Sequence, residues 1–432
     1  MVAQVNLWNK VVGYVLWDDQ RGLATFEFDP GFARNELDIS PITMPLKEIR
    51  NGKRIYSFPG LEKDTFLGLP GLLADALPDR FGNRMMEAWF ARHGRSLNSI
   101  DPVERLCYTG KRAMGALEFE PVLSPEKDLT TSLEIQEMVN MVNNILAERS
   151  TLNSNIISDG EGTLMSIIRL GTSAGGARPK AVIAYDEKSG EIRSGHIPVP
   201  DNFSQWIIKL DGISDNRLGE SKGFGHIEYA YYLMAKDCDI NMSPCLLMEE
   251  NGRAHFMAKR FDRIGNNEKL HLQSLCGIAH YDYNNPDAFS YEQAFQVMRK
   301  MLLPYTDAEQ LFRRMVFNII ANNNDDHTKN ISFIMDSVGN WSLSPAYDMM
   351  YAYDPGSFWL RRHQMSVNGK RSEMTRNDFL SVAREMNIKS AAQIIDEILQ
   401  HVSQWEQYAK EAGIDDKTVK AVQITFDLKR YF

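Results

Sequence analysis

A polar run of nine residues in the last third of the chain constrains the fold more than any other feature. Residues 322–330 read Asn-Asn-Asn-Asp-Asp-His-Thr-Lys-Asn, after an apolar, helix-patterned segment at 311–321 and before a strand-like segment at 331–335. A loop held between a helix and a strand can keep a carboxylate and an amide at one fixed place. A simple polar turn is the alternative interpretation, because Asn and Asp are both favoured in turns.

The spacing inside this loop matches the catalytic loop of protein kinases. Asp325 and Asn330 stand as the base Asp and the Mg²⁺-binding Asn do in the pattern D-x-x-x-x-N. Asp348 follows two short strand-like segments, where a kinase has the DFG Asp that binds Mg²⁺, although Met-Met follows it here. An Asp that caps a turn at a strand end is the alternative for Asp348.

Two upstream patterns fit phosphate binding. The segment Gly-Thr-Ser-Ala-Gly-Gly-Ala-Arg-Pro-Lys at 171–180 lies between strand-like segments at 164–170 and 181–185, so its backbone N–H groups can approach phosphates. Lys209 lies inside an apolar strand and needs an anionic partner, because an unpaired buried charge is costly. A phosphate or Glu228, on the predicted helix 225–237, could be that partner, whereas a Lys at a strand edge with its ammonium in water is the alternative.

The order of these motifs is that of a protein kinase. Gly loop, strand Lys and helix Glu come first, then a hairpin around Asn251-Gly252, a hinge near 259–263 and the two Asp motifs. Residues 1–60 are rich in short β-type segments, and a polar stretch near 124–128 suggests a boundary. We predict an α+β, protein-kinase-like two-lobed fold: an amino-terminal β-rich subdomain at 1–125, a small kinase lobe at 126–263 and a helical lobe at 264–432.

Composition and charge exclude several classes of protein. The formal net charge of −9 argues against a chain that coats nucleic acid by itself. The four cysteines, at 107, 238, 245 and 276, form no C-x-x-C pair, which indicates reduced thiols and no zinc site. Because the sequence has no signal-peptide pattern and no apolar stretch of about 18 residues, we expect a cytoplasmic protein with no membrane segment.

Taken together, the motifs resemble the HipA family of toxin kinases from bacterial type II toxin–antitoxin modules. The resemblance covers nearly the whole chain and rests on the segments 72–79, 110–116, 173–180, 207–210, 259–263, 325–330 and 345–348. It implies ATP and Mg²⁺ as cofactors, Asp325 as the catalytic base, and Asn330 and Asp348 as the metal ligands. It also implies ATP contacts from Gly175, Gly176, Ala177, Arg178, Lys180, Lys209, Glu228, Lys259, Arg260, Phe261, His327, Lys329, Asn330 and Asp348.

The same resemblance implies partners and regulation. A small HipB-like helix-turn-helix antitoxin is the expected partner, with operator DNA bound mainly through it. The expected activity is phosphorylation of a protein Ser or Thr, for which an aminoacyl-tRNA synthetase is the family's example, together with growth inhibition and operon co-repression. Ser173 falls where some members autophosphorylate, so we predict it as a regulatory phosphosite.

Some residues depart from one branch of the family, and two other functions stay open. Arg178-Pro179 replaces Gln-Glu, Lys259 replaces Glu, and Asp326 replaces Gly. The first alternative is a small-molecule kinase of the aminoglycoside-phosphotransferase type, which shares the catalytic-loop chemistry. The second is a catalytically weak corepressor that acts by binding its antitoxin on operator DNA.

Overall fold

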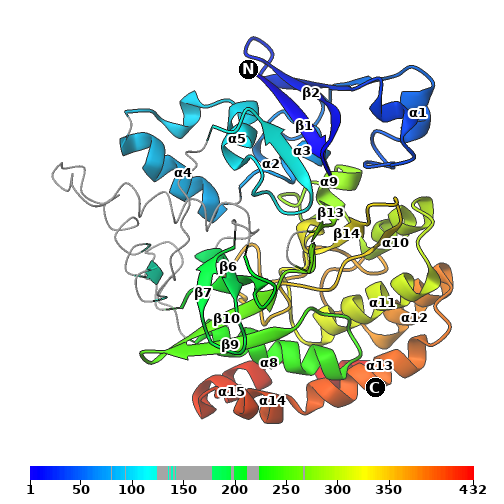
Figure 1. Cartoon of the computed structure of the whole chain (residues 1–432). Helices are drawn as coiled ribbons and strands as arrows, with labels where there is room; N and C mark the ends of the chain where they lie inside the picture. Colours follow the sequence, from blue (N-terminus) through cyan, green and yellow to red (C-terminus); the bar gives the residue numbers. More distant parts are fainter. Residues whose placement is uncertain are drawn as a thin grey trace.

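The structure of the chain is a computed structural model, and Figure 1 shows its three parts in chain order. A sheet with short helices (blue to cyan) is followed by a second sheet (green) and a helical region (yellow to red). The residues that the structure describes are 1–78, 80–92, 94–123, 135, 138–139, 142, 178–195, 199–211, 223–265 and 268–432.

The N-terminal domain, residues 1–123, is built on an antiparallel sheet with the strand order β4-β3-β2-β1-β5. Its inward side chains, such as Val5, Val15 and Phe26, are fully buried, as expected for strands with one covered face. The strands are β1 (Val2–Leu7), β2 (Lys10–Asp18), β3 (Leu23–Phe28), β4 (Ile55–Tyr56) and β5 (Leu117–Glu120). The helices are α1 (Leu46–Arg50), α2 (Lys63–Phe66), α3 (Gly71–Ala74), α4 (Arg80–Arg92) and α5 (Pro102–Thr109), with 3₁₀ turns η1 (Phe32–Arg34) and η2 (Leu97–Ser99).

The small lobe, residues 178–259, is a second antiparallel sheet with the order β7-β6-β8-β10-β9 and one helix, α8 (Phe224–Asp237), packed on β9 and β10. Gly225 allows this packing, because a Cβ there would collide with the Ala254 carbonyl. The predicted helix and the hairpin at Asn251-Gly252, where both φ values are positive, are confirmed. The strands are β6 (Lys180–Tyr185), β7 (Ile192–Ser194), β8 (Ser204–Lys209), β9 (Cys245–Glu250) and β10 (Arg253–Lys259).

The large lobe, residues 263–432, has one three-stranded sheet, β13-β14-β15, and helices that enclose the largest core. Tyr231 of α8 packs edge-on against Phe317 and Trp405, which joins the two lobes. The strands are β11 (Arg263–Ile264), β12 (Glu268–Lys269), β13 (His271–Ser274), β14 (Ser332–Met335) and β15 (Trp341–Leu343). The helices are α9 (Leu275–Ala279), α10 (Tyr291–Lys300), α11 (Tyr305–Ile320), α12 (Arg376–Met386), α13 (Ala391–Ser403), α14 (Trp405–Glu411) and α15 (Asp416–Gln423), with 3₁₀ turns η3 (Thr328–Asn330) and η4 (Leu428–Tyr431).

This arrangement confirms the predicted fold class, an α+β fold with a kinase-like pair of lobes behind a β-rich N-terminal domain. The predicted strand 164–170 lies outside the described residues, whereas that at 181–185 is β6. The limits of the three predicted domains stay predictions.

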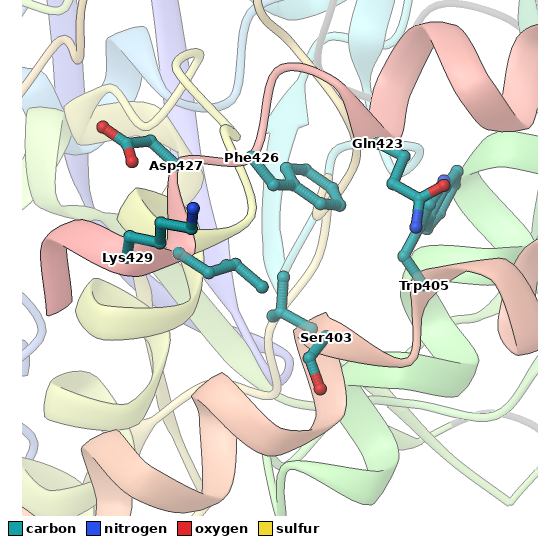
Figure 2. A pocket seen from close by; sticks show the side chains of 8 residues that line it. Ser403, Trp405, Gln423, Phe426, Asp427 and Lys429 are labelled. Carbon is teal, nitrogen blue, oxygen red and sulfur yellow. The ribbon is translucent and has the colours of Figure 1, made fainter. Parts of the chain in front are cut away.

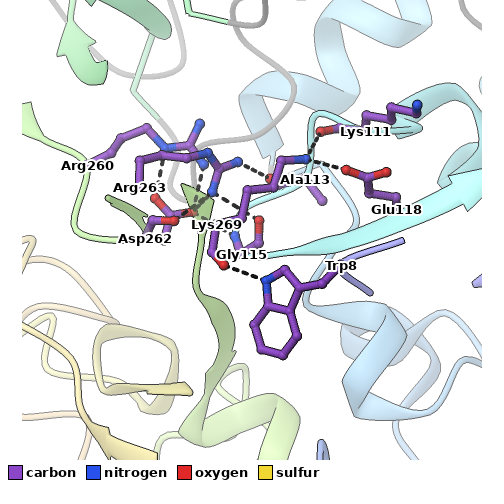
Figure 3. A network of polar contacts seen from close by, with 9 residues as sticks. All are labelled: Trp8, Lys111, Ala113, Gly115, Glu118, Arg260, Asp262, Arg263 and Lys269. Carbon is purple, nitrogen blue, oxygen red and sulfur yellow. Dashed lines mark hydrogen bonds and ion pairs between the residues drawn. The ribbon is translucent and has the colours of Figure 1, made fainter. Parts of the chain in front are cut away.

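A buried ion network fastens the N-terminal domain to the segment that follows β10 (Figure 3). The Asp262 carboxylate accepts hydrogen bonds from Arg260 at 2.9 and 2.7 Å, from Arg263 at 2.7 Å and from the Gly115 N–H at 2.7 Å. Arg263 also donates to the carbonyls of Ala113 and Gly115. Burial alone would raise the pKa of Asp262, but the two guanidinium groups outweigh it and hold that pKa well below its usual range.

Replacing Asp262 with Ala should destabilise the chain by about 3–5 kcal/mol, because two buried arginines would lose their counter-charge. Urea denaturation followed by tryptophan fluorescence measures the loss. The matched control is Asp396→Ala, which removes an exposed carboxylate bound to Arg376 and should cost less than about 1 kcal/mol. Equal losses in the two variants would contradict the structural role of the network.

Candidate active site

A cluster of charged side chains lies where β8, α8 and the loop after β15 meet. Lys209 on β8 donates to the Asp348 carboxylate at 2.5 Å and also to Glu228 of α8. Glu228 is buried, and Arg178 lies 3.7 Å from its second oxygen. The structure therefore contains the ion pair between strand Lys and helix Glu that the sequence suggested.

Two further positively charged side chains lie near the ion pair of Lys209 and Glu228. Lys180 of β6 stands directly opposite Lys209 of β8 and is almost fully buried. Like charges that face each other across strands destabilise a sheet unless anions lie between them. Arg178 adds a third positive charge and stacks on the Phe224 ring at 4.2 Å. Three cations beside two carboxylates give the cluster a net positive charge, which would stabilise a polyphosphate.

Asp348 remains a carboxylate at neutral pH. Burial would raise its pKa, but the positive charges of Lys209 and Lys180 outweigh burial and lower the pKa to about 2. Its backbone has a φ of 52°, in the left-handed region that a residue other than Gly rarely adopts. Asp tolerates this region better than most residues, so the turn fixes the direction of the Asp348 side chain at modest cost.

The predicted catalytic loop closes the site from the large lobe. The Asn330 amide donates to the Asp325 carbonyl at 2.8 Å, so the two ends of D-x-x-x-x-N are joined directly. Half of the Asp325 side chain remains exposed, and its carboxylate lies 3.8 Å from His327. Partial burial raises the pKa of Asp325, the negative charges of Asp348 and Asp326 raise it further, and His327 opposes them. Asp325 and Asp348 thus belong to one electrostatic site, and Asp325 is a better proton acceptor than an ordinary carboxylate.

The three residues predicted at the hinge have different surroundings. The Phe261 ring stacks on Tyr347, the neighbour of Asp348, with ring centroids 5.7 Å apart. The Lys259 ammonium is partly exposed and lies 3.7 Å from Glu187. Arg260, predicted with Lys259 and Phe261 at the adenine-facing hinge, has a buried guanidinium bound to Asp262, and its contact with ATP stays a prediction.

Of the remaining predicted contacts, the structure describes Lys329 and leaves four glycine-loop residues outside the described ranges. The Lys329 ammonium lies over the Tyr283 ring at 4.9 Å and acts on the carboxylate of Asp75 in the N-terminal domain, so the structure places it toward that domain. Outside the described residues lie Ser173, Gly175, Gly176 and Ala177.

The sequence did not identify Asp326 as a site residue, although the structure gives it a supporting role. Its buried carboxylate accepts from the Tyr291 hydroxyl at 2.9 Å and from the Gln364 N–H at 2.7 Å, and lies 3.1 Å from His363. Asn324 donates to the Leu360 carbonyl at 2.9 Å. Asn324 and Asp326, on either side of Asp325, therefore hold residues 360–364 against the loop. The run of Asn and Asp at 322–326 is the sequence signal that could have revealed this supporting role.

The residues at the site fit a magnesium ion bound together with phosphates. Asn330 and Asp348 offer the hard oxygen ligands that Mg²⁺ prefers, and such an ion takes only one or two protein ligands beside its phosphates. Within the described ranges, no group of three or more His, Cys, Asp or Glu side chains could hold a metal ion without such help.

A separate cavity of about 280 Å³ lies between α13, α15 and η4 (Figure 2). None of the predicted site residues lines it. Its lining combines Trp405 and Phe426 with Val402, Leu428 and the polar side chains of Ser403, Gln423, Asp427 and Lys429. Among the helices that the structure describes, none is both long and apolar enough to cross a membrane.

Comparison with known proteins agrees with this geometry. Residues 172–406 match the HipA-like C-terminal domain and residues 3–120 the HipA N-terminal domain. The fold is similar to that of a HipA chain solved in a Shewanella oneidensis MR-1 toxin–antitoxin complex of HipA, HipB and operator DNA. The TM-score is 0.67 at 17% identity, covering 99% of this chain and 97% of that one.

Two curated relatives match shorter stretches. "Putative kinase Y4mE" of Sinorhizobium fredii is 25% identical over 126 residues, or 27% of this chain and 30% of the relative. "Putative kinase" of Haemophilus influenzae is 29% identical over 107 residues, or 22% of this chain and 30% of the relative. The chain thus spans about 30% of the length of each. Because the C-terminal family pattern alone covers more than half of the sequence, the chain belongs to the HipA family.

Proposed function

We propose that this chain is an ATP- and Mg²⁺-dependent serine/threonine protein kinase, the toxin of a HipBA-like toxin–antitoxin module. The observation that carries the proposal is the meeting of Lys209, Glu228 and Asp348 with the Asp325–Asn330 loop at one site. A lysine–glutamate pair, a carboxylate with a low pKa and a carboxylate with a raised pKa are the groups that phosphoryl transfer requires.

Each residue has a defined task in this proposal. Bound Mg-ATP supplies the phosphoryl group and the charge that stabilises its transfer. Lys209, Lys180 and Arg178 bind phosphate oxygens, while Asn330 and Asp348 provide the metal ligands. Asp325 orients the acceptor hydroxyl and takes its proton as the new O–P bond forms and the bond to the β-phosphate oxygen breaks.

The direct test is transfer of labelled phosphate from [γ-³²P]ATP and Mg²⁺ to proteins of a dialysed bacterial lysate, followed by phosphoamino-acid analysis. Label in phosphoserine or phosphothreonine is expected, and it should depend on added Mg²⁺. No incorporation by the full-length chain would contradict a protein kinase and would favour a corepressor that acts by binding alone.

An exposed aromatic pair beside the site favours a protein acceptor over a small molecule. Phe358 and Trp359 are 56% and 40% exposed and pack edge-on, with ring centroids 5.2 Å apart. Their segment is held to the catalytic loop by the bond from Asn324 to the Leu360 carbonyl. Exposed aromatic residues on a fixed backbone are typical of protein-binding surfaces.

Replacing both Phe358 and Trp359 with Ser should lower phosphate incorporation into lysate proteins about tenfold, the loss expected from an aromatic contact worth somewhat over 1 kcal/mol. ATP affinity should not change, because neither ring belongs to the charged cluster. Val338→Ser, at a 73% exposed position on the β14–β15 turn, is the matched control and should behave like the unmodified chain. If the double variant incorporates as much phosphate into lysate proteins as the unmodified chain, the aromatic pair does not bind the acceptor protein.

The proposal extends to partners and regulation. We infer a HipB-like helix-turn-helix antitoxin, operator DNA contacted mainly through it, growth inhibition with operon co-repression, and a cytoplasmic location. Support comes from membership of the HipA family and from the net charge of −9, which disfavours DNA binding by this chain alone. An aminoacyl-tRNA synthetase as substrate and autophosphorylation of Ser173 belong to the same proposal.

A further inference from the structure

A partly buried carboxylate of the N-terminal domain, Asp75, contacts the part of the large lobe that holds the catalytic loop. Asp75, directly after α3, is partly buried and accepts hydrogen bonds from both the backbone N–H and the hydroxyl of Ser274, at 2.7 and 2.8 Å. Ser274 ends β13 and caps α9, since its hydroxyl also accepts from the Gly277 N–H at 3.0 Å. One side chain of the N-terminal domain therefore fixes the junction between a strand and a helix of the large lobe.

Helices α3 and α9 lie side by side at unusually close range (Figure 1). A Cβ on Gly277 would collide with the Asp75 carboxylate, and a Cβ on Gly71 would collide with the Gly277 carbonyl. The His280 ring accepts a hydrogen bond from the Gly71 N–H at 3.0 Å. This contact leaves no room for the helices to move independently, so the position of α3 sets that of α9.

The far side of this junction is the catalytic loop itself. The Leu275 N–H donates to the Ile331 carbonyl at 2.7 Å, and Ser274 pairs with Ser332. At the other end of α9, the Thr328 hydroxyl donates to the Tyr281 carbonyl at 2.7 Å. Both flanks of Asn330 are thus fixed to the helix that Asp75 holds, and the Lys329 charge faces the same carboxylate.

We propose that Asp75 is a positioning residue for the catalytic loop, so that the N-terminal domain is a working part of the active site. The inference rests on the proposed kinase function, because Asn330 matters as a metal ligand only in that reaction. Groups that orient a ligand from behind typically change metal affinity or activity 10–100-fold when removed.

The test uses the full-length chain and Asp75→Ala. Mn²⁺ affinity, measured by electron paramagnetic resonance with a non-hydrolysable ATP analogue, should fall about 10–100-fold, and kcat should fall with it. Affinity for the analogue without metal should not change, because Lys209 and Lys180 are not touched. Asp75→Asn should recover most of the Mn²⁺ affinity, since its amide can accept from the Ser274 N–H and donate to the hydroxyl.

Trp341→Phe is the matched control. Its indole donates to the Asp38 carbonyl at 2.9 Å, another bond between the N-terminal domain and the large lobe, but at the far end of the β14–β15 hairpin. This variant should lower Tm and leave Mn²⁺ affinity unchanged. If Asp75→Ala does not fold, Ser274→Ala replaces it and should weaken Mn²⁺ binding in the same direction.

If Asp75→Ala has the Mn²⁺ affinity and kcat of the unmodified chain, the positioning role is wrong and Asp75 contributes only to packing. The same result in Ser274→Ala would count in the same way where Asp75→Ala does not fold. A full-length chain that transfers no phosphate at all would instead contradict the proposed function, so the two failures are distinguishable.

Discussion

Asp325→Asn should lower phosphoryl transfer about 10³-fold, within the range for removal of a general base, while ATP still binds. The Asp325 carboxylate is half exposed, so an acceptor can reach it, and its raised pKa favours proton uptake. The folded chain should be at least as stable as the unmodified one. The reason is that a carboxyl group whose pKa is raised on folding destabilises the folded state at neutral pH, and the neutral amide removes that cost.

Three measurements check this prediction: labelled-phosphate transfer, Tm, and the mass of the peptide that contains Ser173. Phosphate on Ser173 in the unmodified chain but not in the variant would support autophosphorylation. The matched control is Asp396→Asn, which neutralises an exposed carboxylate that binds Arg376 and should keep full activity. Transfer within tenfold of the unmodified chain would show that Asp325 is not the base.

Lys209→Ala should weaken ATP binding about 10- to 100-fold, because a charged hydrogen bond to phosphate is worth about 1.5–3 kcal/mol. It should also destabilise the chain by about 3 kcal/mol, since buried Glu228 and partly buried Asp348 would both lose the ammonium group between them. Fluorescence titration with a nucleotide analogue and urea denaturation measure the two effects. Lys410→Met, which breaks an exposed pair with Glu406, should change neither.

The stability effect of Lys209→Ala should depend on pH in a defined direction. Because the pKa of Asp348 is lowered to about 2 on folding, its contribution is fully present above about pH 4 and is lost as the pH falls toward 2. The difference in free energy of unfolding between the two chains should therefore shrink over that interval. A difference that stays constant from pH 5 to pH 2 would mean that Lys209 stabilises the fold by packing and not through Asp348.

The sequence alone determined those features that depend on neighbouring residues. The helix at 224–237, the hairpin at Asn251-Gly252 and the loop 322–330 between a helix and a strand follow from apolar periodicity and turn-forming residues. The pairing of Lys209 with Glu228 could also be anticipated, because a lysine inside an apolar strand must find an anion and the next helix offered one. The fold class and most of the candidate site could therefore be predicted from the sequence.

Only the tertiary structure decided which distant partner each buried charge takes. Arg260 lies in the predicted hinge, and its side chain binds Asp262, whose carboxylate is also held by Gly115 of the N-terminal domain. Asp75 gave no local signal, because its partner Ser274 is 199 residues away in the sequence. A buried carboxylate binds whichever donors the packed domains bring within about 3 Å, and that choice depends on how the domains dock, which no local pattern of residues records.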